Sequence, residues 1–194
     1  LRGYWPYVDG DQNDPVAAAR YSELMADSQH LIANHILDAI KLKPGQRLLD
    51  IGGGTGTFAR LASERFPEAS TAVFDLPQVI AAISRRHRGT MEVVSGNMFE
   101  DSIPKTFDTI SLVRILHDHD DAPVDRLLNR CFDALPNGGE LIIAEPMAGT
   151  PNAESIGHTY FGFYLWAMGS GRPRTYEELK AALQRAGFHG IKEK

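Results

Sequence analysis

The sequence predicts an α/β fold with a doubly wound, mostly parallel sheet. Two observations carry this prediction. Short apolar runs of strand length alternate with segments of helical periodicity between residues 47 and 145. A turn in which Gly52, Gly54 and Gly56 occupy alternate positions follows the first of these runs. Because strands that alternate with helices form parallel sheets with right-handed crossovers, the pattern is Rossmann-like.

Turn and cap signals set the expected elements in order. Strands are expected at 47–51, 71–75, 91–95, 107–113 and 140–145, and helices at 57–66, 77–85, 125–135, 155–168 and 175–186. Pro67 ends the first helix, and Pro77 suits the first position of the second. Thr175 and Glu178 have the spacing of a capping box, and Gly187 is expected to end the last helix.

The first 40 residues differ from the rest. Residues 1–15 are rich in glycine, proline and aromatic residues and are expected to form a linker. Residues 16–40 have a helical pattern, which we interpret as two helices with a break near Asp27. We therefore separate residues 1–40 from a main domain at 41–194.

The composition and charge of the chain argue against some classes of function. The 194 residues are 43% hydrophobic and 23% charged, as in one large globular domain. The net charge of −5, with no basic run, argues against a nucleic-acid partner. No apolar run is long enough for a membrane span and no signal peptide is found, so a cytoplasmic location is expected. Cys131 lies in an apolar helical pattern and is expected to be buried.

The glycine turn favours a cofactor site. Asp50, Gly52, Gly54 and Gly56 give D-x-G-x-G-x-G, in which a backbone without Cβ atoms can approach a ligand closely. The dinucleotide fingerprint G-x-G-x-x-G would place its third glycine at Thr57, so it does not match. The spacing resembles the S-adenosylmethionine site of class I methyltransferases. A purely structural tight turn is the alternative.

Polar residues also follow the next two strands. Asp75 ends the second strand, where a carboxylate can accept hydrogen bonds from both ribose hydroxyls; an ordinary helix N-cap is the alternative. Asn97 and Met98 follow the third strand. An adenine would lie there between apolar groups, and the Asn97 side chain would hydrogen-bond to its edge.

The cluster from His117 to Asp121 has three interpretations. A metal site is disfavoured because adjacent residues seldom converge on one ion, and a solvated loop with a helix cap is the second possibility. In the third, one histidine is a general base, since imidazole titrates near neutral pH. Glu145, which ends the neighbouring strand, would then orient the ring. His119 is expected to face the loop surface.

Aromatic residues crowd into one segment. Tyr160, Phe161, Phe163, Tyr164 and Trp166 lie within seven residues. The segment forms either a helix buried on all sides or an apolar wall over the active site.

Six motifs together resemble the plant-type small-molecule O-methyltransferases, which include caffeate and acetylserotonin methyltransferases. They are Asp50-Ile-Gly-Gly-Gly-Thr-Gly, Phe74-Asp-Leu-Pro, Gly96-Asn-Met-Phe, Leu116-His-Asp-His-Asp-Asp, Ala134-Leu-Pro-Asn-Gly-Gly and Ala144-Glu-Pro. The resemblance implies that His117 is the base and Glu145 its partner. Within the family, the segments Gly3-Tyr-Trp-Pro-Tyr and Ala18 to Ser28 are most similar to carotenoid O-methyltransferases, which act on hydroxyneurosporene-type alcohols.

The resemblance also implies the remaining site residues. Contacts with S-adenosyl-L-methionine are assigned to Asp50, Gly52, Gly54, Gly56, Asp75, Leu76, Asn97, Met98 and Arg114. Contacts with substrate are assigned to Met25, Tyr160, Tyr164 and Met168, and residues 1–40 would supply substrate-contacting helices. No metal is expected.

Three departures from the family pattern matter. Asn97 replaces the usual aspartate, but an amide oxygen still accepts a hydrogen bond from adenine. Pro173 occupies the place of the second glutamate beside the base, so His117 is expected to rest on Glu145 alone. The chain starts with Leu and shows neither the family's N-terminal winged-helix dimerisation domain nor its last strand, so we expect a piece of a longer, homodimeric protein.

The sequence thus predicts methyl transfer from S-adenosyl-L-methionine to the hydroxyl oxygen of a small apolar alcohol or phenol, with a carotenoid 1-hydroxyl as one candidate. Two alternatives stay open. One is a nicotinamide-dependent oxidoreductase, which the glycine spacing disfavours. The other is a catalytically degenerate methyltransferase fold that serves as a binding module.

Overall fold

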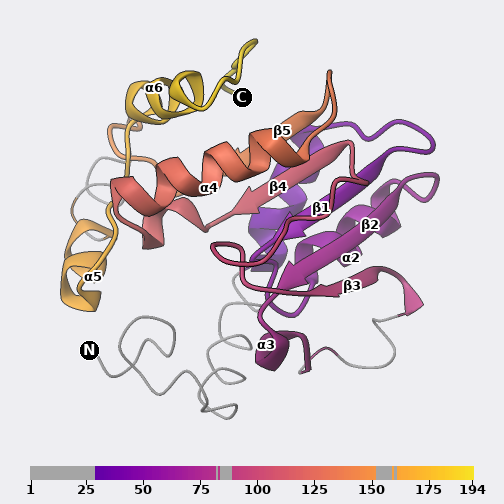
Figure 1. Ribbon diagram of the computed structural model, residues 1–194. Coiled ribbons are helices and arrows are strands. Elements are labelled where there is room, and N and C mark those ends of the chain that lie inside the picture. The colour runs from indigo at the N-terminus through magenta and orange to yellow at the C-terminus, as the bar shows by residue number, and fades with distance from the viewer. Residues whose placement is uncertain (1–28, 82, 84–88, 152–158, 160) are drawn as a thin grey trace. The chain divides into compact units, whose positions relative to one another are not determined.

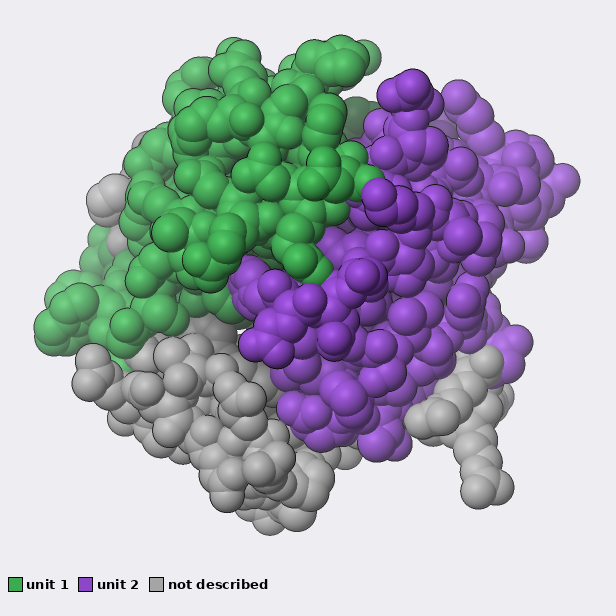
Figure 2. Space-filling view, in the orientation of Figure 1, with its two compact units in different colours: residues 1–12, 114–133, 143–194 green, residues 13–113, 134–142 purple. Residues whose placement is uncertain are grey.

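The computed structural model describes residues 29–81, 83, 89–151, 159 and 161–194, without the side chains of residues 161, 164 and 168. The chain divides into two compact units (Figure 2). Unit 1 comprises residues 1–12, 114–133 and 143–194, and unit 2 comprises residues 13–113 and 134–142.

Five strands form one sheet, as predicted. They are β1 (Arg47–Ile51), β2 (Ser70–Asp75), β3 (Glu92–Ser95), β4 (Thr109–Val113) and β5 (Glu140–Ala144). Their order is β3-β2-β1-β4-β5 (Figure 1). β1 pairs in parallel with β2 and β4, and β2 pairs in parallel with β3. The predicted doubly wound, mostly parallel fold is confirmed; β4 begins two residues later than expected, at Thr109.

The core of unit 2 lies around β1 and β2. Leu48, Leu49 and Ile51 of β1 are fully buried, as is Phe58 of helix α2 (Thr57–Arg65), which packs on these two strands. Strands of a parallel sheet are buried on both faces, which explains the continuous apolar runs seen in the sequence. Residues 29–39 are helical, in agreement with the second of the two helices predicted before β1.

The next two helices in chain order, α3 and α4, have bounds that can be compared with the prediction. Helix α3 is described over Pro77–Ala81, and most of its predicted extension to residue 85 lies outside the described residues. Helix α4 (Asp121–Ala134) begins four residues before the predicted Asp125. Pro123 lies in its first turn, where the missing N–H has no helical acceptor and costs no bond. Cys131 is buried in α4 as predicted, and burial raises the pKa of its thiol to about 12.

Unit 1 contains the short 3-10 helix η3 (Leu116–Asp118) and two further helices, α5 (Phe161–Met168) and α6 (Tyr176–Arg185). The predicted capping box is present at the start of α6: Thr175 Oγ1 accepts a bond from the N–H of Glu178, whose carboxylate accepts one from the N–H of Thr175. Gly187, with φ 99°, follows the end of α6. No helix in the described part of the chain combines the length and apolarity that a bilayer span requires.

Helix α5 is not buried on all sides, so that alternative for the aromatic segment is wrong. Leu165 is fully buried, whereas the side chains of Phe163 and Trp166 are 69% and 79% exposed. Their rings form an edge-to-face pair with centroids 6.3 Å apart. The segment thus presents two aromatic rings to solvent.

Candidate active site

In unit 2 the glycine turn is bonded to the end of β2. Gly52, Gly54 and Gly56 have φ values of 69°, 59° and 80°, which residues with a Cβ rarely adopt. Asp75 Oδ2 accepts a hydrogen bond of 2.8 Å from the N–H of Gly54, and its Oδ1 accepts one of 2.7 Å from the N–H of Leu76. Burial raises the pKa of Asp75, and these two bonds oppose that rise. The carboxylate therefore fixes the shape of the turn that it faces.

Asp50 lies beneath the same turn. It is 1% exposed, and its Oδ1 accepts a hydrogen bond of 2.7 Å from Ser111 Oγ of β4. Its Oδ2 has no hydrogen-bond partner among the described residues, and a Cβ on Gly53 would overlap this atom. Burial raises the pKa of Asp50 to about 7; the Ser111 bond opposes the rise and the charge of Asp75 adds to it.

The loop after β3 carries the predicted adenine contacts. Asn97 Oδ1 accepts a hydrogen bond of 2.9 Å from the N–H of Phe99, and Asp101 Oδ2 accepts one of 2.8 Å from the N–H of Asn97. The Asn97 amide thus shapes its own loop. Its carbonyl oxygen has a second lone pair for a ligand donor, so the adenine contact stays a prediction.

These residues of unit 2 fit the methyl-donor cofactor expected from the sequence. The turn is built of glycine backbone, which a ligand can approach where a Cβ would otherwise lie. Asp50 Oδ2 is a buried acceptor without a donor among the described residues. A ligand that combines an ammonium group with ribose hydroxyls matches this set, because carboxylates bind both groups.

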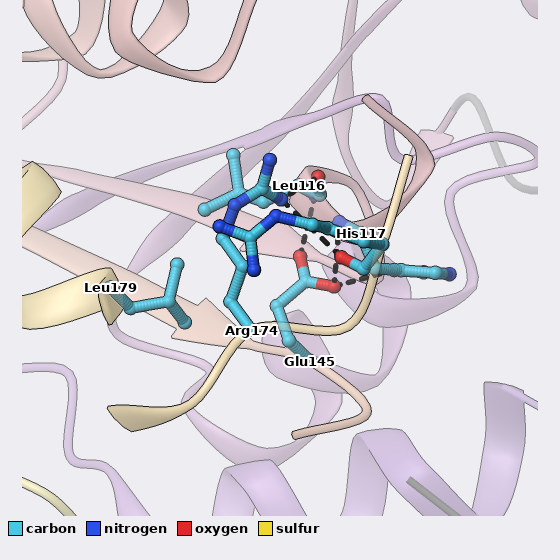
Figure 3. Close-up of a pocket in the computed structure, with 6 residues that line it drawn as sticks. Leu116, His117, Glu145, Arg174 and Leu179 are labelled. Carbon is cyan, nitrogen blue, oxygen red and sulfur yellow. Dashed lines mark hydrogen bonds and ion pairs between the residues drawn. The ribbon is translucent and has the colours of Figure 1, made fainter. Parts of the chain in front are cut away.

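In unit 1 the side chain of His117 lies on η3 and is 5% exposed. His117 Nδ1 and Glu145 Oε2 are 2.5 Å apart, so the predicted pairing of the two residues is present (Figure 3). The Glu145 carboxylate also accepts bonds from the backbone N–H groups of Ile115, Leu116 and His117, at 2.9, 2.7 and 3.3 Å. One carboxylate thus holds both the ring and the backbone of the turn.

His117 does not rest on Glu145 alone, and that expectation is wrong. Its Nε2 lies 3.1 Å from Asp118 Oδ1, so the ring contacts two carboxylates. Burial acts to lower the pKa of His117, but the Glu145 bond and the charges of Asp118 and Glu145 outweigh it, and the pKa is raised. Burial raises the pKa of Asp118 to about 6. The second carboxylate beside the ring thus comes from the next residue in the chain.

His119 was expected to face the loop surface. It is half-buried, and burial, followed by the charge of His117, lowers its pKa to about 4. Its imidazole is therefore neutral at physiological pH. His117, by contrast, has a carboxylate near each of its ring nitrogens.

Of the other predicted site residues, some are described by the structure and some are not. Arg114, assigned to the cofactor, lies in unit 1, has φ 59° and donates its N–H to Ala144 O at 2.8 Å. Met25 and Tyr160 lie outside the described residues, as do the side chains of Tyr164 and Met168. Across residues 29–81, 89–151 and 161–194, no group of histidine, cysteine or acidic side chains has the geometry of a metal site.

One buried residue near His117 was missed. Arg174, 4% exposed, lines a small pocket of unit 1 together with Leu116, His117, Glu145, Arg172 and Leu179 (Figure 3). An arginine in Gly-Arg-Pro-Arg-Thr between two elements has no periodic pattern, so no sequence signal marked it as buried. Asp118 was noted only as a member of its cluster.

A family model for the O-methyltransferase domain matches residues 4–189. The chain belongs to the O-methyltransferase family. Demethylspheroidene O-methyltransferase of Rhodobacter capsulatus is 44% identical over 190 residues, which cover 97% of this chain and 48% of that relative. The protein of the same name from Cereibacter sphaeroides is 40% identical, with 99% and 52% covered. The chain thus spans about half the length of the curated relatives it matches.

Solved structures of the family share the fold. Human N-acetylserotonin methyltransferase, in complex with SAM, superposes with a TM-score of 0.85 at 22% identity over 93% of this chain and 53% of that one. An O-methyltransferase from neocarzinostatin biosynthesis, in complex with S-adenosyl-L-homocysteine and 1,4-dihydroxy-2-naphthoic acid, gives 0.81 at 28% identity over 91% and 54%. The predicted family resemblance, including the likeness to carotenoid O-methyltransferases, is confirmed.

Proposed function

We propose that the protein transfers a methyl group from S-adenosyl-L-methionine to the hydroxyl oxygen of a small apolar molecule, with His117 as the general base. The observation that carries the proposal is the buried His117 ring held at 2.5 Å by Glu145. A base needs a raised affinity for protons and a fixed orientation, and the two carboxylates beside this ring supply both.

Unit 2 would hold the cofactor. Asp50 would accept from its ammonium group and Asp75 from its ribose, while the backbone of Gly52, Gly54 and Gly56 leaves room for it. The predicted cofactor contacts of Leu76, Asn97 and Met98 belong to the same proposal, as does that of Arg114, although Arg114 is a residue of unit 1. When bound, S-adenosyl-L-methionine supplies a methyl group that its sulfonium already activates, so the chain's own residues need to orient the hydroxyl and remove its proton.

The proton transfer follows from the contacts of the ring. In this proposal Nδ1 donates its hydrogen to the Glu145 carboxylate, which makes Nε2 the nitrogen that accepts the substrate proton. Nε2 would accept the substrate proton, and Asp118, 3.1 Å away, would then face an imidazolium that carries its proton at that atom. The negative charges of Asp118 and Glu145 stabilise this cation, which is why both raise the pKa of His117.

The substrate proposed is an alcohol of the carotenoid class. Identities of 44% and 40% to two demethylspheroidene O-methyltransferases support it over a flat phenol. The exposed rings of Phe163 and Trp166 on α5 supply apolar surface of the kind that a long polyene contacts. Met25, Tyr160, Tyr164 and Met168, and the helices within residues 1–40, are proposed to contact this substrate.

The assembly and location are further proposals. We expect the full-length protein to be a homodimer, as the family resemblance implies. The net charge of −5 without a basic run supports the absence of a nucleic-acid partner, and the expected cytoplasmic location rests on the lack of an apolar span or signal peptide in the sequence. Light scattering during size-exclusion chromatography of the full-length protein would measure the mass. A monomeric mass across the working concentration range would contradict the dimer.

Methylation assays on the full-length protein test the function. Incubation with S-adenosyl-L-methionine and a carotenoid tertiary alcohol should give a product whose mass is increased by CH2, because a methyl group replaces the hydroxyl hydrogen, and a flat phenol should react more slowly. His117→Gln should keep S-adenosylhomocysteine binding in calorimetry but lower turnover by roughly 10²–10⁴-fold, the usual contribution of a general base. Glu145→Gln should cost less and His119→Gln least. NADH binding without any response to S-adenosylhomocysteine would overturn the proposal.

A further inference from the structure

The backbone carbonyl groups around His117 have their own set of partners, separate from Glu145. Glu145 binds the N–H groups of residues 115–117. The carbonyl groups of residues 116–119 face residues 170–174, which we call the clamp loop. The turn that carries the proposed base is therefore held on its donor side by one residue and on its acceptor side by this loop.

Arg174 makes the central contacts of the clamp loop. Its Nη1 donates to Leu116 O and its Nη2 to His119 O, both at 2.8 Å, so the guanidinium spans the two ends of the turn. Its Nε and Nη2 donate to Asp121 Oδ1 on α4, at 3.0 and 2.7 Å. Its own carbonyl accepts from the N–H of Ala148, in the segment that follows Glu145.

Two more residues of the clamp loop touch the same turn. Ser170 Oγ donates to Asp118 O at 3.1 Å. Gly171 has φ +80°, and a Cβ there would overlap His117 O and lie 2.6 Å from the carbonyl carbon of Asp118. The loop therefore packs directly on the backbone of the proposed base, and only glycine allows this approach.

We propose that Arg174 is a positioning residue for the general base, because it fixes the backbone of the His117 turn and so keeps the imidazole in register with Glu145. The proposal rests on the function proposed above for His117. The guanidinium donates to main-chain carbonyls and to Asp121, so its effect on the ring runs through Leu116 and His119. A misplacement of a catalytic group by about 1 Å can cost on the order of 10²-fold in rate.

The guanidinium shape, and not only its charge, carries this role. Three nitrogens of Arg174 donate to three acceptors that lie on different sides of a planar fork. A lysine ammonium is a single point of donation on a flexible stem and cannot span the two carbonyls at once. Arg174→Lys is therefore a sharp test, because it keeps the buried charge and removes the geometry.

The experiment compares Arg174→Lys with Arg185→Lys in the full-length protein. Arg185, the last residue of α6, pairs with Asp125 of α4 at 2.8 Å, but its side chain is 59% exposed and this ion pair joins α6 to α4 rather than to the His117 turn. Three quantities are measured: S-adenosylhomocysteine affinity by calorimetry, the pKa of the His117 ring by imidazole NMR, and kcat apart from KM. Ring titration needs no substrate, so it tests the role of Arg174 even if the proposed methylation fails.

Arg174→Lys should leave S-adenosylhomocysteine affinity unchanged, lower the pKa of His117 toward its ordinary value and reduce kcat by roughly 10- to 100-fold. The pKa falls because a loosened turn weakens the Glu145 bond that raises it. Arg185→Lys should change none of the three. A purely structural role would instead lower Tm without moving the His117 titration, and that result would overturn the proposal.

A second variant tests the proposal if Arg174→Lys does not fold. Ser170→Ala removes only the hydroxyl that binds Asp118 O, and it should shift the His117 titration in the same direction by a smaller amount. If Arg174→Lys is unfolded and Ser170→Ala leaves the titration of the wild-type protein unchanged, the clamp loop supports the fold only and the proposal is wrong.

Discussion

Replacement of Asp50 by asparagine should stabilise the ligand-free protein, and the gain should grow with pH. The carboxyl is fully buried with one oxygen unpartnered among the described residues. Between its ordinary value of 3.8 and about 7, the folded protein holds a proton on Asp50 that the unfolded chain has released. Because the folded state binds more protons in this window, stability falls as pH rises through it. An asparagine at this position would not titrate and would keep the acceptor for Ser111.

The size of the effect follows from the pKa. A rise from 3.8 to about 7 corresponds to about 4 kcal/mol at about 1.4 kcal/mol per unit, reached above pH 7. Between pH 5.5 and 8.5 the advantage of the asparagine variant should therefore increase by about 2 kcal/mol. For a protein of this size that is a Tm difference of roughly 4–8 °C. The unpartnered Oδ2 becomes an unpartnered NH2, a cost of about 1–3 kcal/mol that does not depend on pH.

Thermal unfolding of both proteins across that pH range measures the difference in Tm, in which titrating groups that do not interact with Asp50 cancel. Asp38→Asn is the matched control, since it makes the same exchange at a side chain that is 62% exposed. Calorimetry should show that Asp50→Asn binds S-adenosylhomocysteine more weakly. A Tm difference that stays flat or shrinks with rising pH would refute the buried, proton-binding state of Asp50.

Three further predictions follow from the structure. The base works only when it is neutral, so kcat should rise with pH as His117 loses its proton. The Glu145 bond raises the pKa of His117, so Glu145→Gln should shift this rise of kcat to lower pH, and a shift to higher pH would contradict the role of Glu145. Gly171→Ala should lower Tm more than Gly138→Ala. Both glycines have φ +80°, so both substitutions cost about 1–2 kcal/mol in backbone strain, but of the two only a Cβ at Gly171 would meet backbone atoms. An equal loss of Tm in the two variants would contradict the close approach of Gly171 to the His117 turn. Cys131, with a pKa of about 12, should resist iodoacetamide at pH 8 until the protein is unfolded, as mass spectrometry can show.

The fold was largely predictable because its signals are local. The apolar runs of β1 and β2 and the box at Thr175 and Glu178 each depend on a few adjacent residues. The start of α4 was misplaced because Pro123 usually indicates a break, although a first helical turn tolerates it. Exposure of Trp166 was not predictable, since an apolar helix has no polar face from which to infer its orientation.

The candidate site was predictable only where its residues lie at strand ends. His117, Asp75 and Glu145 were found that way, because parallel strands bring their carboxyl ends to one edge. Asp118 was not assigned to the ring, since which neighbour turns toward an imidazole depends on the 3-10 geometry of η3. Arg174 was not found at all, because its acceptors are main-chain carbonyls more than 50 residues away in sequence, and carbonyls leave no mark on a sequence.

The double use of Glu145 has a consequence for how relatives of this chain diverge. Its carboxylate binds three backbone N–H groups as well as the imidazole. Selection for folding alone would therefore retain a glutamate at this position in a descendant that no longer turns over substrate. Retention of Glu145 is consequently no marker of activity, and a lineage that abandons catalysis should lose His117 first while the glutamate beneath it persists.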